Sequence, residues 1–276
     1  MTFVYHRPDT LDEALRLKEA NEGARFLAGG TDLLVEGGCG TRCPPTVISL
    51  RRIESLRGVG EGRIGALTLI ADLVTHPLVR ERYPVLAQAA GRIGSVQIRN
   101  AATIGGNLCR AAPCADTAPP LLVYEARLLL RRAGGAREVP LEDFLLGPGE
   151  TCLGPDEVLE AVLLGPPRAG ARGVFLKRGR VRMDLSLASV AVLLETEQDR
   201  CRRVRIAAGA VAPTPVRLRE VEALLEGEAI TKELLAEAQA LAQRSVDPVT
   251  DVRATEAYRR RLTGVFVRRA LEELLA

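Results

Sequence analysis

The chain has few of the residues on which several common protein chemistries depend. Its 276 residues include no tryptophan, 3% aromatic residues in total and only two histidines. Proteins that bind single-stranded nucleic acid stack bases on aromatic side chains set among basic ones, and that combination is missing here. Two histidines leave little material for a zinc site or a catalytic triad. The composition therefore argues against nucleic-acid binding, zinc binding and triad-type hydrolysis.

Long apolar runs and targeting signals are also missing. The longest apolar stretches, such as residues 185–194, are interrupted by polar residues and fall short of the ~20 residues that cross a membrane. The N-terminal sequence MTFVYHRP lacks the basic-then-apolar pattern of a signal peptide. We therefore expect a cytoplasmic protein with reduced thiols and no membrane span.

Cysteine spacing gives no support for a metal site. None of the six cysteines forms a C-x-x-C pair, and histidine is too scarce to complete a zinc ligand set. We expect no metal on this chain. The cysteines are Cys39, Cys43, Cys109, Cys114, Cys152 and Cys201.

The charge is nearly balanced. The 38 lysines and arginines exceed the 35 acidic residues by three, whereas a nucleic-acid binder concentrates positive charge. We interpret the arginine clusters as solvated faces with glutamate partners, some of which remain available to a partner protein. The clusters lie at residues 178–182, 200–205, 259–261 and 268–269.

The length suits two compact domains, and the hydrophobic fraction of 47% is enough for ordinary buried cores. A capping box, in which the Thr10 hydroxyl caps the helix and Glu13 reaches back to the Thr10 amide, predicts a helix that ends near Gly23. Apolar residues at helical spacing predict a second helix at residues 85–93. Branched and apolar runs predict strands at residues 25–28, 46–50, 63–68, 126–131 and 158–164.

Residues 165–170, GPPRAG, form the clearest linker. Three strands are predicted after it, at residues 174–177, 187–195 and 204–209. The last stretch of roughly 55 residues is rich in Ala, Leu, Glu and Arg, and predicts helices separated by Gly227 and by Asp247-Pro248. The fold class is therefore α+β.

Two short glycine-containing loops are the most informative features. The first glycine loop, AGGTDLL at residues 28–34, follows a predicted strand, and the second, TIGGN at residues 103–107, follows QIRN. Paired glycines let successive amides point into one hollow and let a diphosphate approach closely. The hydroxyls of Thr31 and Thr103 and the amide of Asn107 offer further donors.

These loops match neither of the common nucleotide motifs. The spacing G-x-G-x-x-G is absent, and so is a Walker A lysine motif. A dinucleotide held between two lobes by two separated loops fits the pattern better. The structural alternative, for either loop taken alone, is that it is a plain tight turn or a helix entry.

The sequence at this point resembles the FAD-binding medium subunit of the molybdenum hydroxylases. This family includes bacterial carbon monoxide dehydrogenase, xanthine dehydrogenase and related aldehyde or heterocycle dehydrogenases. The resemblance runs nearly end to end, and its most specific segment is QIRNAATIGGNL at residues 97–108. The other matching segments are AGGTDLL (28–34), IGALT (64–68), PLVRE (77–81), ADTAPPLL (115–122), GAVAPTPVR (209–217) and YRR (258–260).

The resemblance implies a two-lobed FAD-binding domain of the vanillyl-alcohol-oxidase (PCMH) type at residues 1–168, with lobes at about 1–55 and 56–168. A C-terminal α+β domain with a small antiparallel sheet and helices would occupy residues 169–276. Both glycine loops would bind the FAD diphosphate from opposite sides, and Asp116 would lie near the nucleotide part. The implied FAD contacts are Arg25, Phe26, Leu27, Ala28, Gly29, Gly30, Thr31, Asp32, Leu33, Ile93, Thr103, Ile104, Gly105, Gly106, Asn107, Asp116, Leu159 and Lys177.

Several of these positions have structural alternatives. Asp116 is placed to cap a helix at residues 117–124, Ile93 and Leu159 are typical core residues, and Lys177 could be an exposed charge at a strand end. Some relatives also hold an iron–sulfur cluster in an insertion after the second glycine loop. Thiolates suit iron, but the insertion is missing here, so we favour ordinary thiols at Cys39, Cys43, Cys109 and Cys114.

The resemblance also implies a role in a complex. Substrate would be oxidised at the molybdenum cofactor of a large partner subunit, and electrons would cross [2Fe–2S] clusters of a small partner to reach this FAD. An external acceptor such as NAD, a quinone or oxygen would then be reduced. Because the cofactor carries the redox chemistry and the protein supplies binding and orientation, we name no catalytic side chain.

Two alternatives stay open. A stand-alone flavoprotein oxidase or reductase of the same fold would need its own substrate pocket and acid–base residues, which the sequence does not show. An assembly subunit that has lost its flavin would not need the intact pairs Gly29-Gly30 and Gly105-Gly106. The colour of the purified protein separates the second alternative, and a turnover assay on the isolated chain separates the first.

Overall fold

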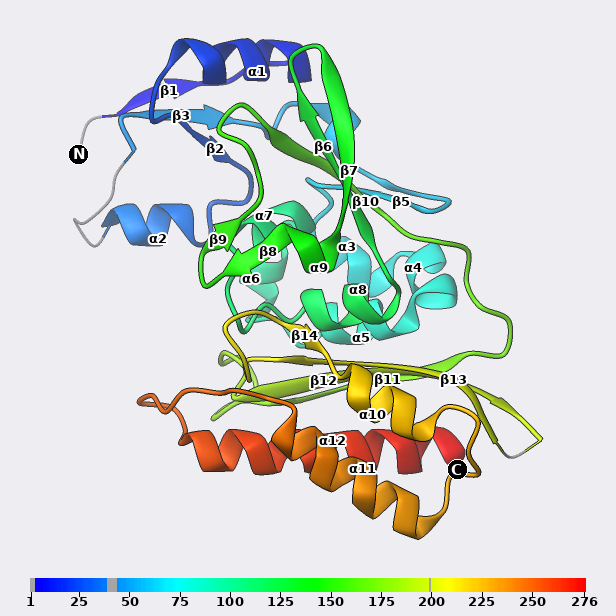
Figure 1. Cartoon of the computed structure of the whole chain (residues 1–276). Helices are drawn as coiled ribbons and strands as arrows, with labels where there is room; N and C mark the ends of the chain where they lie inside the picture. Colours follow the sequence, from blue (N-terminus) through cyan, green and yellow to red (C-terminus); the bar gives the residue numbers. More distant parts are fainter. Residues whose placement is uncertain (1–2, 39–43, 199) are drawn as a thin grey trace.

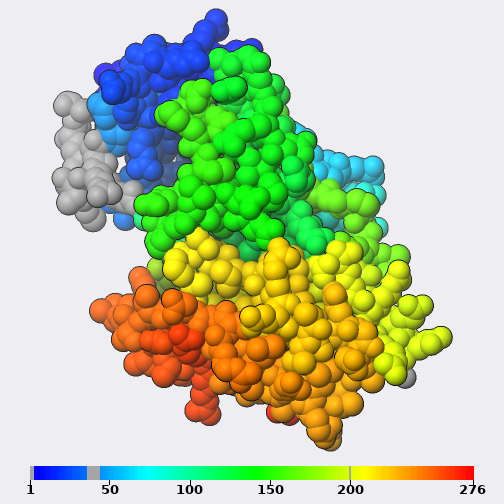
Figure 2. Space-filling view, in the orientation of Figure 1, coloured from blue at the N-terminus to red at the C-terminus, as the bar shows by residue number. Residues whose placement is uncertain are grey.

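The computed structural model describes residues 3–38, 44–198 and 200–276. In this part of the chain a parallel sheet, a five-stranded antiparallel sheet and a four-stranded antiparallel sheet follow one another from end to end of the molecule (Figure 1). Figure 2 shows the N-terminal residues at one end, the middle of the chain between, and the C-terminal residues at the other end. The predicted α+β class is confirmed, as is the small antiparallel sheet near the C-terminus.

The first lobe is a three-stranded parallel sheet with one covering helix. Its strands lie in the order β1 (Val4–His6), β3 (Thr46–Ser49) and β2 (Arg25–Leu27). Helix α1 (Leu11–Ala20) forms the crossover from β1 to β2 that parallel strands require. It places Leu15 on a core that also contains Ile48.

Helix α1 begins as the capping pattern predicts, with one correction. The Thr10 hydroxyl accepts a hydrogen bond from the Glu13 amide at 3.2 Å. The Glu13 carboxylate, however, accepts from the amide of Asp9 at 3.0 Å and not from that of Thr10. After the helix, Gly23 adopts φ +71°, a left-handed conformation that glycine adopts without a Cβ penalty.

The second lobe is built on an antiparallel sheet in the order β4-β5-β10-β6-β7. Short helices, most of them of four to seven residues, cover it, and a small β8–β9 hairpin joins them. The strands are β4 (Val59–Gly60), β5 (Arg63–Gly65), β6 (Arg127–Arg132), β7 (Gly135–Pro140), β8 (Leu145–Gly147), β9 (Glu150–Thr151) and β10 (Val158–Leu163). The helices are a 3-10 turn (Glu54–Leu56), α3 (Ile70–Thr75), α4 (Pro77–Arg82), α5 (Pro84–Ala90), α6 (Val96–Arg99), α7 (Ile104–Cys109), α8 (Ala118–Val123) and α9 (Leu141–Phe144). A further short helix, α2 (Leu33–Gly38), lies between β2 and β3 of the first lobe.

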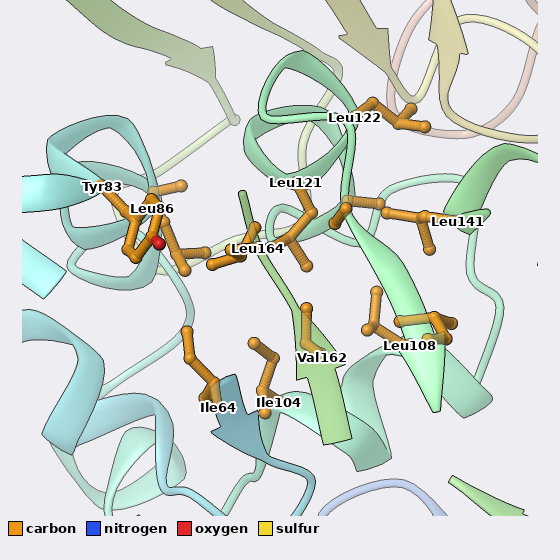
Figure 3. Close-up of a cluster of buried hydrophobic side chains, with 14 of the residues drawn as sticks. Ile64, Tyr83, Leu86, Ile104, Leu108, Leu121, Leu122, Leu141, Val162 and Leu164 are labelled. Atoms are coloured by element: carbon orange, nitrogen blue, oxygen red, sulfur yellow. The ribbon is translucent and has the colours of Figure 1, made fainter. Parts of the chain in front are cut away.

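The core of the second lobe lies between this sheet and these helices. Figure 3 shows Ile64 and Val162 from the sheet facing Ile104 and Leu121 from α7 and α8. The strand predicted at residues 63–68 ends at Gly65, because the Thr68 amide turns back to donate to the Gly65 carbonyl at 2.9 Å. That turn directs the chain into α3.

The C-terminal part is a four-stranded antiparallel sheet in the order β11-β12-β13-β14. Helices α10 and α12 contact one face, with α11 packed on these two helices, and α5 and α8 of the second lobe lie against the other face (Figure 1). Burial on both faces explains why residues 190–194 read as an unbroken apolar run. The elements are β11 (Arg172–Arg178), β12 (Ala188–Glu197), β13 (Arg200–Gly209), β14 (Val216–Arg217), α10 (Arg219–Leu225), α11 (Lys232–Arg244) and α12 (Glu256–Leu275).

Polar contacts fix this sheet against the second lobe. The amide of Phe175 on β11 donates to Oε1 of Gln88 on α5 at 2.9 Å. The amide of Ala210, just after β13, donates to the carbonyl of Pro113 at 2.7 Å. The segment that precedes α8 is therefore held by the C-terminal sheet.

Candidate cofactor site

A cavity of about 280 Å³ lies between the first and second lobes. This volume is close to the lower end of the range for small-molecule pockets, roughly 300–1,000 Å³. Both glycine loops line it, together with the segment at residues 153–159 that leads into β10. The structure thus brings together two loops that are distant in the sequence.

The first glycine loop presents a row of unpaired amides. Gly30 has φ +80°, which turns the chain sharply between β2 and α2. Within the part of the chain that the structure describes, the amides of residues 29–33 donate to no protein acceptor. Arg51 holds the loop by its carbonyls, donating to those of Ala28 and Gly29 at 3.2 and 3.0 Å. Successive free amides of this kind form a binding site for an anion such as a phosphate.

The second glycine loop is not such a row, so the expectation of amides from both loops is wrong. The Gly105 amide donates to the Ala66 carbonyl at 2.8 Å, and the Gly106 amide donates to the Thr103 hydroxyl at 3.1 Å. The amides of Ile104 and Asn107 are also paired, with the carbonyls of Thr68 and Thr103. Thr103 is the N-cap of α7, so this loop is the start of a helix. It can contact a ligand through its glycine surface and its side chains, but not through these paired amides.

The glycines chiefly allow the backbones to approach one another. A Cβ on Gly105 would lie 2.7 Å from both the Cβ and the carbonyl oxygen of Ala66. A Cβ on Gly29 would lie 2.1 Å from the carbonyl oxygen of Ala101, just before the second loop. Gly106 also faces Ala28 across the site. The two loops are therefore in direct contact, and no side chain of their glycines fills the cavity.

Asn107 is oriented by a neighbour that the sequence did not reveal. The hydroxyl of Thr117 donates to Oδ1 of Asn107 at 2.6 Å. Because Oδ1 is the acceptor in this bond, the NH₂ group of Asn107 is left as the donor on the side of the cavity. Thr117 is fully buried, which keeps this orientation fixed.

Asp116, Lys177 and Ser186 form a second cluster outside this cavity. The Lys177 ammonium donates to Oδ2 of Asp116 at 2.6 Å and to the Arg92 carbonyl at 3.1 Å. The Ser186 hydroxyl donates to Oδ1 of Asp116 at 2.5 Å. Burial raises the pKa of Asp116, and the Lys177 charge opposes that rise. The alternatives of a helix-capping Asp116 and an exposed Lys177 are both wrong, since the Lys177 side chain is 5% exposed.

The remaining predicted positions fall in three environments. Leu27 and Ile104 are buried core residues, while Leu159 is buried and also lines the cavity. Ile93 is partly buried beside Arg92 and packs on the core of the second lobe. Those that line the cavity are Arg25, Phe26, Ala28, Gly29, Gly30, Thr31, Asp32, Leu33, Thr103, Gly105, Gly106, Asn107 and Leu159.

Sequence reasoning missed one wall of the cavity, at residues 153–158. Here Glu157 accepts from both Arg137 Nε and Nη2, at 2.7 and 2.8 Å, and from the Gly154 amide at 2.7 Å. These hydrogen bonds, led by those from Arg137, lower the pKa of Glu157. The GPDE turn at residues 154–157 was the available signal, because Gly, Pro and Asp favour turns.

Lys18 of α1 was also missed. Its ammonium donates to the Ala24 carbonyl and lies 5.8 Å from the centre of the Phe26 ring. Burial, with the nearby Arg25 charge, lowers the pKa of Lys18. Other lining residues that the sequence did not point to are Leu50, Ala66, Leu67, Ala102, Cys109 and Arg110.

The cysteines that the structure describes are free thiols. Burial raises the pKa of Cys109 to about 12, which keeps this cavity-lining thiol protonated. Cys39 and Cys43 lie outside the described residues. Among the residues that are described, no group of three or more His, Cys, Asp or Glu side chains is arranged to hold a metal ion. The helices in the same part of the chain are all too short or too polar to cross a membrane.

Comparison with known proteins identifies the family. Residues 1–167 match the model for the FAD-binding domain in molybdopterin dehydrogenase. The chain belongs to this family. Residues 174–274 match the CO dehydrogenase flavoprotein C-terminal domain. The resemblance inferred from the motifs is thereby confirmed, and the chain is a member of the FAD-binding medium subunits of the molybdenum hydroxylases, which are oxidoreductases.

Individual relatives align over almost the whole chain. The carbon monoxide dehydrogenase medium chain of Hydrogenophaga pseudoflava is 34% identical, over 98% of this chain and 96% of the relative. The xanthine dehydrogenase FAD-binding subunit of Escherichia coli O157:H7 is 32% identical, over 99% and 96%. A solved structure of carbon monoxide dehydrogenase from H. pseudoflava superposes with a TM-score of 0.96 at 34% identity, covering 100% of this chain and 98% of that one.

Proposed function

We propose that this chain binds FAD between its lobes and transfers electrons within a molybdenum hydroxylase complex. In this proposal electrons arrive from the iron–sulfur clusters of a small partner subunit, while a large partner subunit carries the molybdenum cofactor. They leave to an external acceptor such as NAD, a quinone or oxygen. The observation that carries the proposal is the row of unpaired amides at residues 29–33, which opens on a cavity between the lobes.

The residues fit the diphosphate of FAD. Unpaired amides at the first glycine loop supply donors, and Asn107 contributes its NH₂ from the opposite side. Arg51 donates to two of the loop carbonyls and so holds these oxygens away from the site where the diphosphate would bind. When bound, FAD supplies the redox chemistry, taking up and releasing electrons singly or in pairs. The protein's own residues bind it, orient it and exclude water.

We propose that the flavin end of the cofactor, and not the nucleotide part that the resemblance places near Asp116, lies beside Asp116, Lys177 and Ile93. The side chains of Lys177 and Asp116 are both buried, so water screens their ion pair little. The pair therefore provides a fixed dipole beside the flavin. Asn107 connects this cluster to the diphosphate site, since its partner Thr117 follows Asp116 directly. Leu159 would pack against the cofactor from the β10 side.

An apolar edge lies next to this cluster and is the surface we assign to the iron–sulfur partner. Val181 and Met183 are 64% and 60% exposed on the loop that leads to Ser186. Arg178, at the end of β11, and Arg182, on this loop, are both exposed, so an acidic rim on the partner would complement them. Electron transfer needs close approach to the flavin end, and this edge offers it.

We also propose that the chain divides near residues 168 and 169, with lobes at about 1–55 and 56–168. Three clusters of buried residues, centred on the first lobe, the second lobe and the C-terminal part, support this division. The second-lobe cluster also takes in one face of the C-terminal sheet, through Phe175, Ala191, Leu193 and Ala207. A cytoplasmic location is part of the same proposal. Fractionation of cells that produce the native complex tests the location.

Purification of the full chain tests FAD binding directly. The protein is expected to be yellow, or to become yellow on addition of FAD, and to retain the flavin on gel filtration. A colourless protein that refuses FAD would support the flavin-free assembly subunit instead. Turnover of candidate alcohols with acceptor dyes by the isolated chain would support a stand-alone oxidase or reductase, whereas electron transfer that requires the partner subunits supports the proposal.

A further inference from the structure

Arg259 is a buried arginine far from the cavity, in the first half of α12. It is 4% exposed and belongs to the YRR segment, for which no role has emerged so far. Its Nη1 donates to the carbonyl of Leu187 at 2.8 Å and to the carbonyl of Ala210 at 3.1 Å. Its Nη2 donates to Oδ1 of Asp251 at 2.8 Å. One guanidinium therefore joins the start of β12, the end of β13 and the loop before α12.

Each of the two residues whose carbonyls accept from Arg259 is connected to Asp116 or to the segment just before it. Leu187 follows Ser186, whose hydroxyl donates to Oδ1 of Asp116. Ala210 donates its own amide to the carbonyl of Pro113 at 2.7 Å, three residues before Asp116. Ala210 also has φ +64°, a conformation that a residue with a Cβ adopts only when its surroundings hold it there.

We infer that Arg259 is a positioning residue that sets the place of Asp116, and with it the flavin end of the cofactor site. The inference rests on the proposed function in one respect, namely that the flavin end lies beside Asp116. The link from Arg259 to Asp116 is given by the hydrogen bonds themselves. Without Arg259, the Ser186 hydroxyl and the Pro113 carbonyl lose the support of the residues that hold them. The C-terminal part of the chain thereby acts on the geometry of a site formed by the N-terminal part.

A cofactor-free experiment tests the link itself. Cys114 lies between Pro113 and Asp116, so the rate at which a thiol reagent modifies it reports how firmly this segment is held. Mass spectrometry of peptides separates Cys114 from the other cysteines. We expect Arg259→Lys and Arg259→Met to raise the rate of Cys114 modification by roughly tenfold, because local opening becomes easier. Arg268→Gln, which removes an exposed i,i+4 pair with Glu272 on the same helix, should leave the rate unchanged.

The second readout uses FAD. Arg259→Lys should shift the visible spectrum and the midpoint potential of bound FAD. It should lower the affinity for FAD about tenfold, while the affinity for ADP, which lacks the flavin, stays within about twofold of wild type. Combined with Ser186→Ala, its effect should be less than additive, because both act through Asp116. Arg259→Lys is used because it keeps the buried positive charge, which separates the positioning effect from the loss of folding that Arg259→Met risks.

The outcomes separate the two proposals. Modification of Cys114 at the wild-type rate in both Arg259 variants would overturn the inference. Equal losses of FAD and ADP affinity would also overturn it, since they would indicate a general structural effect. If Cys114 is modified faster in the Arg259 variants, as expected, but Asp116→Asn leaves the spectrum of bound FAD unchanged, the positioning role stands and the assignment of the flavin end is wrong.

Discussion

Gly29 and Ala101 approach so closely that a Cβ on Gly29 would lie 2.1 Å from the carbonyl oxygen of Ala101. This contact joins the first glycine loop to the segment that leads into the second. An ion pair between Asp32 and Arg110, at 3.7 Å, links the same two parts of the chain. The width of the cofactor cavity is therefore set by backbone packing between the lobes and not only by the ligand.

Gly29→Ala should separate the lobes. The clash is with backbone, which cannot move as a flexible side chain does, so we expect a loss of stability of about 1–3 kcal/mol. FAD affinity should fall by tenfold or more, about 1.4 kcal/mol. Urea unfolding and FAD titration measure the two effects. Gly135→Ala is the matched control, because a Cβ there would meet nothing within 4 Å; equal behaviour of both variants would contradict the packing argument.

Arg51→Met should weaken FAD binding without direct loss of a ligand contact. Arg51 donates to the carbonyls of Ala28 and Gly29, and without it these peptide groups are free to rotate and turn the amides away. We expect a loss of affinity of about 0.5–1.5 kcal/mol. Arg52→Met is the control, since among the described residues Arg52 pairs with the exposed Asp9 and contacts neither loop carbonyl. An unchanged FAD dissociation constant in Arg51→Met would exclude this role.

Thr117→Val should release the side chain of Asn107. Valine has no hydroxyl, so Oδ1 of Asn107 would lose its 2.6 Å hydrogen bond and the side-chain amide would be free to flip. FAD affinity should drop by roughly fivefold, whereas Thr117→Ser, which keeps the hydroxyl, should restore most of it. Calorimetric titration of the two variants tests this. A serine variant as weak as the valine variant would show that packing of the methyl group, not the hydrogen bond, matters.

The acid stability of the C-terminal part should depend on Asp251. Partial desolvation works to raise its pKa, but hydrogen bonds from the amides of Arg253 and Ala254 and from Arg259 prevail and lower the pKa to about 2, against an ordinary value of 3.8. The unfolded chain therefore takes up a proton first as the pH falls. The contribution of Asp251 is complete above about pH 5 and is lost as the pH falls through 4 toward 2.

The difference in unfolding free energy between wild type and Asp251→Asn measures this contribution. We expect about 1–2 kcal/mol near neutral pH, allowing for the partial exposure of the side chain, and a smaller difference at each step toward pH 3. Urea titrations at several pH values provide the test. A difference that stays constant or grows on acidification would refute the assignment.

The sequence predicted the elements whose signals are local. The N-cap at Thr10 and three of the four strands of the C-terminal sheet were found, because hydrogen bonding near a cap and alternating or continuous apolar runs act over a few residues. Short elements were missed, such as β8 and β9, because two or three residues carry no periodicity. The family followed from AGGTDLL and QIRNAATIGGNL, whose glycines are required by close backbone contacts.

Only the tertiary structure decided how those residues work. From the sequence both glycine pairs looked like amide donors, yet the amides of the second loop pair with Ala66, Thr68 and Thr103. Likewise, Asp116 found its partners Lys177 and Ser186 in the C-terminal part of the chain and not in the next helix. A backbone amide or a carboxylate takes whichever partner folding brings near, and that choice depends on contacts between segments far apart in the chain. Residue type and spacing determined which groups were present, and packing determined which of them were left to bind a ligand.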